Sequence, residues 1–343
     1  EKFIKELSIN KENLEKETSQ EGTLLIMENP HFHDPVNVNH EGMDNFNYFL
    51  DTKDDRYNLK FADGSAPGAF SGSRVKVSGV ELGDYLATSS AEASGFEVVE
   101  SSPPIRAENY GVQKIAIIIT KAPGDEDYDL PFIESHMQKI NDYYNEVSYG
   151  RASLEWDVYG QYDVEGSGYV SITPEIDLDI NFSKYSRIIS IDERNCWGCA
   201  GIGIWSHSTN EGELNISETW VKPVIFQSSN YYSVIGHELG HNFGVLHANN
   251  LRCGDKYIDD FDKCISYEYG DHFDIMGSNI YSFETGHINS LYKETITWLG
   301  SNEIVEVSSD GIYTLNAFEN LSDRTSLKIP RIFDEFRNGE RFY

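Results

Sequence analysis

The chain has 343 residues, enough for two or three domains of ordinary size. It carries 57 acidic and 27 basic residues, for a net charge of −30, and so negative a surface argues against nucleic acid or an anionic membrane as a partner. The mean hydropathy is −0.47, and no apolar run approaches the roughly 20 residues that a membrane-spanning helix needs.

The N-terminal third of the chain predicts a small β-rich domain. Residues 1–20 are charged and lack a clear apolar period, so we expect a loose helix or a tail there. From Gly22 onward, short strand-like stretches alternate with turn residues at 23–27, 47–50, 57–61, 74–77 and 85–87. This pattern predicts a small β-barrel or sandwich, most simply an OB-like barrel. We place the domain at residues 1–104, ending in the linker Ser101–Pro104.

After Pro104 the pattern of apolar residues changes to one that is typical of an α/β domain. The stretch 114–120 is apolar on both faces, as in a buried strand, and apolar residues at helical spacing predict a helix from about Leu130 to Val147. Further strands are expected at 154–158 and 187–191, with a candidate edge strand at 202–206. Two strands at 311–315 and 326–329 would begin a third, β-rich module. The prediction is a multi-domain α+β chain, divided at 1–104, 105–300 and 301–343.

The chain has four cysteines, at positions Cys196, Cys199, Cys253 and Cys264. An even number at close spacing favours two disulfides and an oxidising compartment, which predicts a secreted protein. The spacing favours Cys196–Cys199 and Cys253–Cys264, although the sequence leaves the connectivity open. A redox pair at Cys196–Cys199 is the alternative, whereas a zinc ribbon would need a closer second pair.

One acidic cluster is a candidate calcium site. It comprises Asp255, Asp259, Asp260 and Asp262, which do not have EF-hand spacing. Solvated surface charge is the simpler interpretation of this cluster, and calcium binding is the alternative.

The most informative stretch runs from Gly236 to His247, with the sequence GHELGHNFGVLH. On a helix, His237 and His241 stand four residues apart and project from one face, as two ligands of one metal ion must. Gly244 lets the chain leave the helix, and the turn brings His247 round as a third ligand. Three protein ligands leave a fourth position open, which is typical of catalytic zinc. Glu238 is placed to act on a zinc-bound water without being a ligand.

A second motif supports this hypothesis. Asp274-Ile275-Met276-Gly277 follows the histidines, and a methionine in a tight turn beneath three imidazoles is the Met-turn of the metzincin clan. Core packing is the alternative role for Met276.

With both motifs, the chain resembles a metzincin zinc peptidase. Residues 141–150, 199–205 and 269–277 are similar to segments of gametolysin-type peptidases and, more distantly, of immune-inhibitor-A-type peptidases. The resemblance covers about residues 112–330. It implies a metzincin domain at 105–300, built around an active-site helix and a Met-turn.

The sequence also departs from the clan. Ala248 does not match the residue that usually follows the third histidine in adamalysins, serralysins, matrixins or astacins. Ser278 stands where astacins and serralysins have a tyrosine, so Tyr281 is the nearest candidate for a hydroxyl that assists the transition state. His272 and His287 lie outside the motif, and we expect them to have structural or surface roles.

The expected activity is a zinc endopeptidase acting on proteins or peptides. Glu238 would take a proton from the zinc-bound water and pass it to the leaving amine. An extended substrate would add to the edge strand by β-augmentation. The alternatives are a zinc hydrolase of non-peptide bonds, a catalytically silent binding or adhesion protein, and a latent zymogen. The sequence says nothing of oligomeric state.

The resemblance implies synthesis as a precursor, so residues 1–104 are either a propeptide or a binding domain. No cysteine precedes Cys196, so a blocking group from that domain would be a carboxylate or an imidazole. The candidates are His31, His33, Asp34 and His40, for which a solvated loop is the simpler interpretation.

Overall fold

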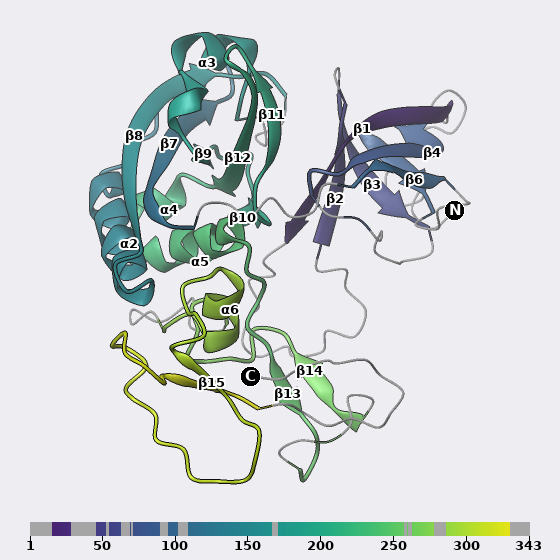
Figure 1. The fold of residues 1–343 in the computed structure, drawn as a ribbon. Helices are drawn as coiled ribbons and strands as arrows, with labels where there is room; N and C mark the ends of the chain where they lie inside the picture. The colour runs from purple at the N-terminus through teal and green to yellow at the C-terminus, as the bar shows by residue number, and fades with distance from the viewer. Residues whose placement is uncertain are drawn as a thin grey trace.

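The computed structural model describes residues 16–28, 46–52, 55–62, 69, 71–89, 95–101, 109–166, 171–256, 259, 263–277 and 286–329 (Figure 1). It is a mixed α+β, strand-rich structure with a small barrel next to a helix-covered sheet. No helix in the described part of the chain has the length and apolar character needed to cross a membrane.

The N-terminal unit is a five-stranded barrel. Its strands are β1 (Lys16–Glu28), β2 (Phe46–Asp51), β3 (Arg56–Phe61), β4 (Arg74–Leu82) and β5 (Tyr85–Thr88), and β6 (Phe96–Glu100) adds to β4. The ring closes in the order β1-β2-β3-β5-β4-β1, with β3 and β5 parallel. Alternating residues such as Leu24, Leu50, Val75 and Val77 fill its core. The small barrel expected from the sequence is confirmed.

One expectation for this unit was wrong. Residues 16–20 are not a helix or a tail but the first part of β1, where they pair with β4. The stabilising partner lies about 60 residues away in sequence, so the local pattern does not reveal it. Residues 1–15 and most of the linker at 101–104 lie outside the described residues.

The second unit is built on four parallel strands in the order β8-β7-β9-β12. These are β8 (Ala152–Asp163), β7 (Gly111–Lys121), β9 (Arg187–Ile191) and β12 (Gly212–Val221). Ile115, Ile117 and Ile119 of β7 face the core under the helices, while Ala116 and Ile118 face a second apolar cluster. Burial on both faces explains why this strand is a continuous apolar run.

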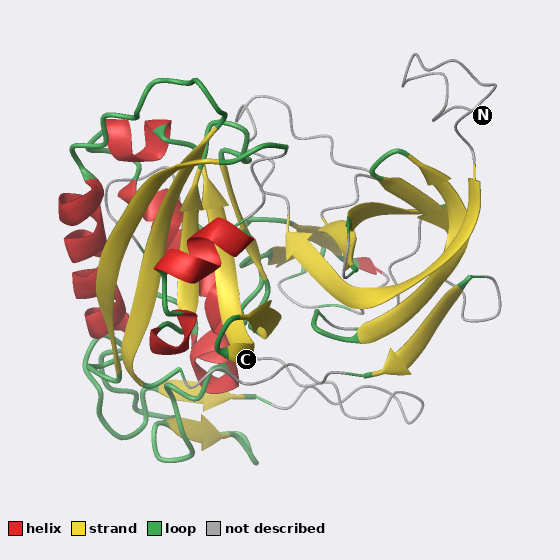
Figure 2. Ribbon diagram, turned by 90° about the horizontal axis from the view of Figure 1, so that it is seen from above, coloured by secondary structure: helices red, strands yellow, loops and turns green. Residues whose placement is uncertain are grey.

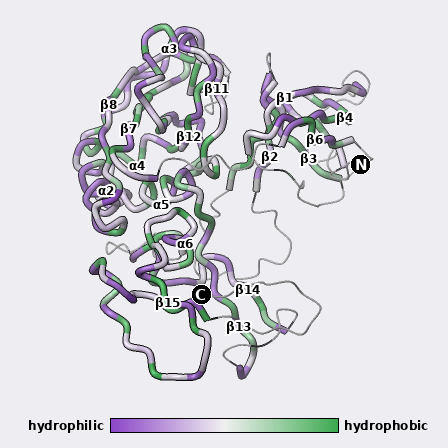
Figure 3. The backbone as a smooth tube through the Cα atoms, viewed as in Figure 1, coloured by the Kyte–Doolittle hydropathy of each residue, from purple (hydrophilic) through white to green (hydrophobic). Residues whose placement is uncertain are grey.

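Two helices cover one face of the sheet. Helix α2 (Ile133–Val147) and helix α5 (Tyr232–Phe243) pack there through residues such as Ile140, Tyr144 and Leu239 (Figure 1). The buried residues of α2 recur at helical spacing, as the sequence predicted, while much of the helix is coloured hydrophilic in Figure 3. The shorter helices are α3 (Pro174–Asp179), the 3-10 turn η2 (Phe182–Lys184), α4 (Val224–Gln227) and α6 (Ser290–Thr295).

The edge strand predicted at 202–206 begins later than expected, at Trp205. Strands β10 (Gly198–Gly201) and β11 (Trp205–Thr209) both run antiparallel to β12, and residues 202–204 turn between them. Gly203 has φ +75° and donates its N–H to the His241 carbonyl, 2.9 Å away, so the chain cannot stay extended there.

Strand β10 is not a free edge, because the end of β1 pairs with it. Met27 lies opposite Gly201 and Glu28 opposite Ala200, so the barrel and the α/β sheet form one continuous sheet (Figure 2). Leu25 and Met27 pack at this junction against Trp205, Trp220 and Cys199.

The C-terminal described segment adds two small sheets. Strands β13 (Asn250–Arg252) and β14 (Ile265–Tyr267) form a hairpin, and β15 (Ile304–Glu306) pairs in parallel with β16 (Ser326–Lys328). The strand predicted at 311–315 is a loop in which Ile312 is fully exposed, so its apolar residues do not form a buried face.

Candidate metal centre

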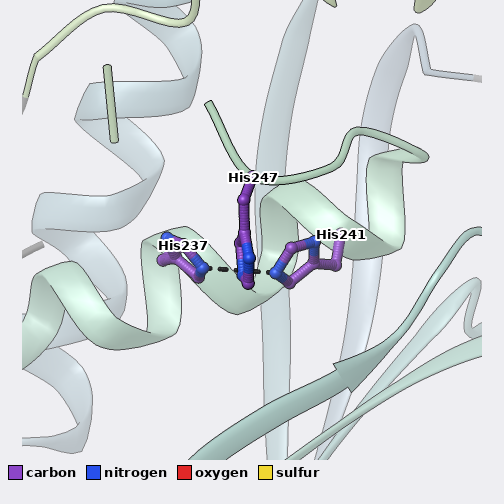
Figure 4. A group of neighbouring side chains, drawn as sticks. All are labelled: His237, His241 and His247. Atoms are coloured by element: carbon purple, nitrogen blue, oxygen red, sulfur yellow. Dashed lines mark hydrogen bonds between the residues drawn. The ribbon is translucent and has the colours of Figure 1, made fainter. Parts of the chain in front are cut away.

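Two of the three predicted ligands lie on one face of α5. His237 and His241 are one helical turn apart, and both are buried. The helix ends at Gly244, whose φ of +97° is a left-handed conformation that most residues resist. The chain then turns and places the His247 ring beside the other two, so that the rings converge on one point (Figure 4).

Each imidazole is anchored through its Nδ1 atom. The Nδ1 of His237 lies 2.8 Å from the Ile275 carbonyl, and that of His241 lies 2.9 Å from the Val245 carbonyl. The Nδ1 of His247 lies 2.7 Å from Oε1 of Glu268. These partners accept hydrogen bonds, so each Nδ1 carries a proton, and a ring with no second proton presents the lone pair of Nε2.

The arrangement of these lone pairs fits a metal ion. The Nε2 atoms of His237 and His241 are 3.2 Å apart, and the ligand atoms of the three histidines all lie within 4.8 Å of one another. Burial and the neighbouring His247 lower the pKa of His237 to about 3, so the ring is neutral. Two nitrogen lone pairs that face each other at this distance repel unless a cation lies between them. Tetrahedral zinc with Zn–N bonds of about 2.0–2.1 Å would separate two nitrogens by about 3.3 Å.

The candidate base lies beside these ligands. Glu238 is fully buried on α5, and its Oε1 is 2.9 Å from where a Cβ on Gly198 would stand. Gly198 is the first residue of β10 and lies within the Cys196–Cys199 loop. Only a glycine leaves room there for the carboxylate. The sequence showed that Gly198 lies between two cysteines, but it did not show that Gly198 lies next to Glu238.

The methionine turn packs directly beneath the helix. A Cβ on Gly240 would lie 2.3 Å from Sδ of Met276, and Met276 is fully buried. Asp274 holds the turn, because its Oδ1 accepts from the Met276 N–H and its Oδ2 accepts from Asn289. Burial raises the pKa of Asp274 to about 6 against the effect of these donors. The glycine in the helix therefore permits the close approach of the turn.

Asn242 ties the helix to the sheet. Its side-chain amide donates to the carbonyls of Gly201 and Glu218, at 3.0 and 2.9 Å, and accepts from the Thr219 hydroxyl. The residue is fully buried, so these bonds fix the distance between α5 and strand β10. The sequence carried no signal for this role beyond a polar residue on an apolar helix.

Both disulfides follow the pairing favoured by the spacing. Cys196 is joined to Cys199 and Cys253 to Cys264, with Cα atoms 6.1 and 4.1 Å apart. The first closes the loop around Gly198, and the second closes the β13–β14 hairpin. Two disulfides are compatible with a secreted protein.

Several other predicted residues are not part of the centre. Tyr281, Asp260, Asp262 and the group His31, His33, Asp34 and His40 lie outside the described residues. Asp259 forms ion pairs with Lys256 and Lys263. Within the described ranges, the three histidines are the only group of at least three potential ligands close enough to hold one ion. His272 is exposed, and His287 contacts the buried Lys293.

No protein-family model matches the chain, and a search of curated proteins found no match.

Proposed function

We propose that this protein is a zinc-dependent endopeptidase of the metzincin type, with His237, His241 and His247 as the ligands and Glu238 as the general base and acid. The observation that supports this most is the set of Nε2 lone pairs directed at one point, next to a buried carboxylate on the same helix. Zinc bound there would polarise a carbonyl oxygen and lower the pKa of water to about 7.

The protein's own residues supply the proton transfers. Glu238 follows His237 on α5 and would accept a proton from the water whose oxygen attacks the scissile carbonyl, then give that proton to the amine as the C–N bond breaks. Asn242 holds Gly201 of β10 against this helix, and the missing side chain of Gly198 leaves room for the carboxylate, so a peptide that replaced β1 along β10 would pass the carboxylate. We favour proteins or peptides over other substrates because an extended chain that displaced β1 could pair with this strand beside the base.

The test is cleavage of a denatured protein, compared between the wild type and Glu238→Ala. Removing a general base typically costs about 10²–10⁴-fold in rate, while zinc content should stay at one per chain because no ligand is lost. Mass spectrometry of the products would show whether peptide bonds are broken. Equal cleavage by both proteins would contradict the assignment of Glu238. Zinc binding without peptide or ester hydrolysis would leave the binding protein and a latent enzyme as candidates, and ester hydrolysis alone would favour a non-peptide hydrolase.

A latent form of the same enzyme is the second candidate, and the junction with the barrel favours it. The backbone of Met27 and Glu28 pairs with β10, the strand along which we expect the substrate to lie. Burial lowers the pKa of Arg56 in the barrel, but the charges of Asp51 and Glu218 raise it by more, so the pKa is raised overall. Because Glu218 belongs to β12, a charge of the sheet is close enough to act on a charge of the barrel. A substrate would have to displace β1 or bind elsewhere.

Latency can be tested by loosening the junction. Met27→Asp places a charge in the apolar cluster with Trp205 and Trp220, and an engineered cleavage site at Ser101–Pro104 separates the units covalently. Activity that rises at least tenfold after both changes would support latency. The same activity before and after them would mean that the barrel does not block the site.

A further inference from the structure

The third histidine is positioned differently from the other two. His237 and His241 are spaced by the helix that carries them, whereas His247 lies beyond the end of α5. Its backbone is held by two contacts: the Tyr292 hydroxyl donates to the His247 carbonyl at 2.7 Å, and the Ala248 N–H donates to the Met276 carbonyl at 2.8 Å. These contacts hold the backbone of His247 and do not involve its ring.

Two residues that follow β14 fix the ring. Oε1 of Glu268 accepts from Nδ1 of His247 at 2.7 Å, and the Tyr269 ring lies on the imidazole with 3.9 Å between centroids. The His247 side chain is 2% exposed and that of Glu268 is 20% exposed. Water therefore only partly screens the Glu268 carboxylate. This group is the one carboxylate among the three described Nδ1 partners, because the other two are backbone carbonyls.

The segment that carries these residues is itself held in place. The Tyr269 N–H donates to the side chain of Asn249 at 3.1 Å, and the side chain of Asn250 donates to the Gly270 carbonyl at 2.9 Å. Tyr269 has φ +54°, a left-handed conformation that costs a non-glycine residue about 1–2 kcal/mol and persists only where surrounding contacts enforce it.

The hairpin below provides a further constraint. Strands β13 and β14 pair in register, with Asn250 opposite Tyr267, and the Cys253–Cys264 disulfide lies next to the pairing of Arg252 with Ile265. The hairpin therefore returns the chain from His247 to Glu268 at a fixed distance.

We infer that Glu268 is a positioning residue for the metal centre: it holds the His247 ring in the tautomer and orientation that aim Nε2 at the ion, and it increases the basicity of that ligand. This inference rests on the proposed zinc site. Loss of such an outer partner typically costs about 10–100-fold in metal affinity. No motif marks Glu268, because it lies 21 residues beyond the histidine that it contacts.

The experiment measures zinc affinity by competition with a chromophoric chelator for the wild type, Glu268→Ala and Glu268→Gln. The control is Asp259→Asn, which removes a carboxylate of similar exposure (17%) in the same hairpin region that pairs with Lys256 and Lys263. Thermal unfolding of each metal-free protein shows whether the variant still folds. The visible spectrum of the cobalt-loaded proteins reports ligand geometry, which a change in stability alone would not alter.

We expect Glu268→Ala to weaken zinc binding about 10–100-fold and to change the cobalt spectrum. Glu268→Gln keeps an acceptor and should lie between Glu268→Ala and the wild type, while Asp259→Asn should bind zinc as the wild type does. Zinc affinity of Glu268→Ala within twofold of the wild type would overturn the inference, as would an equal loss in Asp259→Asn. If Glu268→Ala does not fold without metal, Glu268→Gln decides by the same criteria. A wild type that does not bind zinc would instead overturn the proposed function.

Discussion

Substituting alanine for Gly198 tests whether strand β10 sets the position of Glu238, the proposed catalytic carboxylate. The new Cβ would stand 2.9 Å from Oε1 of Glu238 and 2.7 Å from Cγ1 of Val234. Ordinary contacts of these kinds are about 3.4–4.0 Å, so the carboxylate or the strand must move by about 0.5–1 Å. A misplacement of about 1 Å can cost 10²-fold in rate, which corresponds to about 2.7 kcal/mol in transition-state energy.

The assay is kcat/KM on a quenched fluorescent peptide, in the form of the protein that is active on denatured protein. We expect Gly198→Ala to lose about 100-fold in kcat/KM and to keep its zinc affinity, because Gly198 contacts no ligand histidine in the described contacts. Overpacking should also lower the free energy of unfolding by about 1–3 kcal/mol.

A double-mutant cycle separates this mechanism from general destabilisation. If Gly198→Ala acts through Glu238, it should add no further loss in a Glu238→Ala background. A full 100-fold loss in both backgrounds, or wild-type activity in Gly198→Ala alone, would refute the reasoning.

Three further predictions concern the supports of the site. Gly240→Ala places a Cβ 2.3 Å from Sδ of the buried Met276, so we expect a loss of about 1–3 kcal/mol in urea unfolding, and an unchanged midpoint would contradict the packing argument. Asn242→Ala leaves two carbonyls without this donor, so unfolding should become easier by about 2–4 kcal/mol, with Asn242→Asp no better because it lacks the amide donor. Burial lowers the pKa of Lys293 to about 7 in the folded protein, whereas the ordinary pKa of a lysine is 10.5. Between these two pH values Lys293 is therefore protonated in the unfolded chain and neutral in the folded protein. Stability should therefore rise with pH across that window, by at most about 1.4 kcal/mol per pH unit, and Lys293→Met should flatten the rise in urea unfolding at pH 7 and 9.5.

The sequence by itself determined the parts of the site that depend on local geometry. Four-residue spacing on a helix fixes His237 and His241 on one face, and a glycine with positive φ lets the chain turn toward His247. The alternating pattern of the barrel strands is also local, because each strand has one face in the core. The two disulfides joined cysteines that are close in sequence, so the spacing was a sufficient guide.

Only the tertiary structure decided how these parts are completed. The contacts of Glu268 with His247, of Gly198 with Glu238 and of Met27 with Gly201 join residues about 20 to 170 positions apart, and no local period encodes such pairs. The error at 202–206 has the same origin, since the bond from Gly203 to the carbonyl of His241 turns a stretch that locally favours a strand. Long-range hydrogen bonds and packing outweigh propensities of a few tenths of a kcal/mol per residue, so they decide which strands are edges and which carboxylate meets the third histidine.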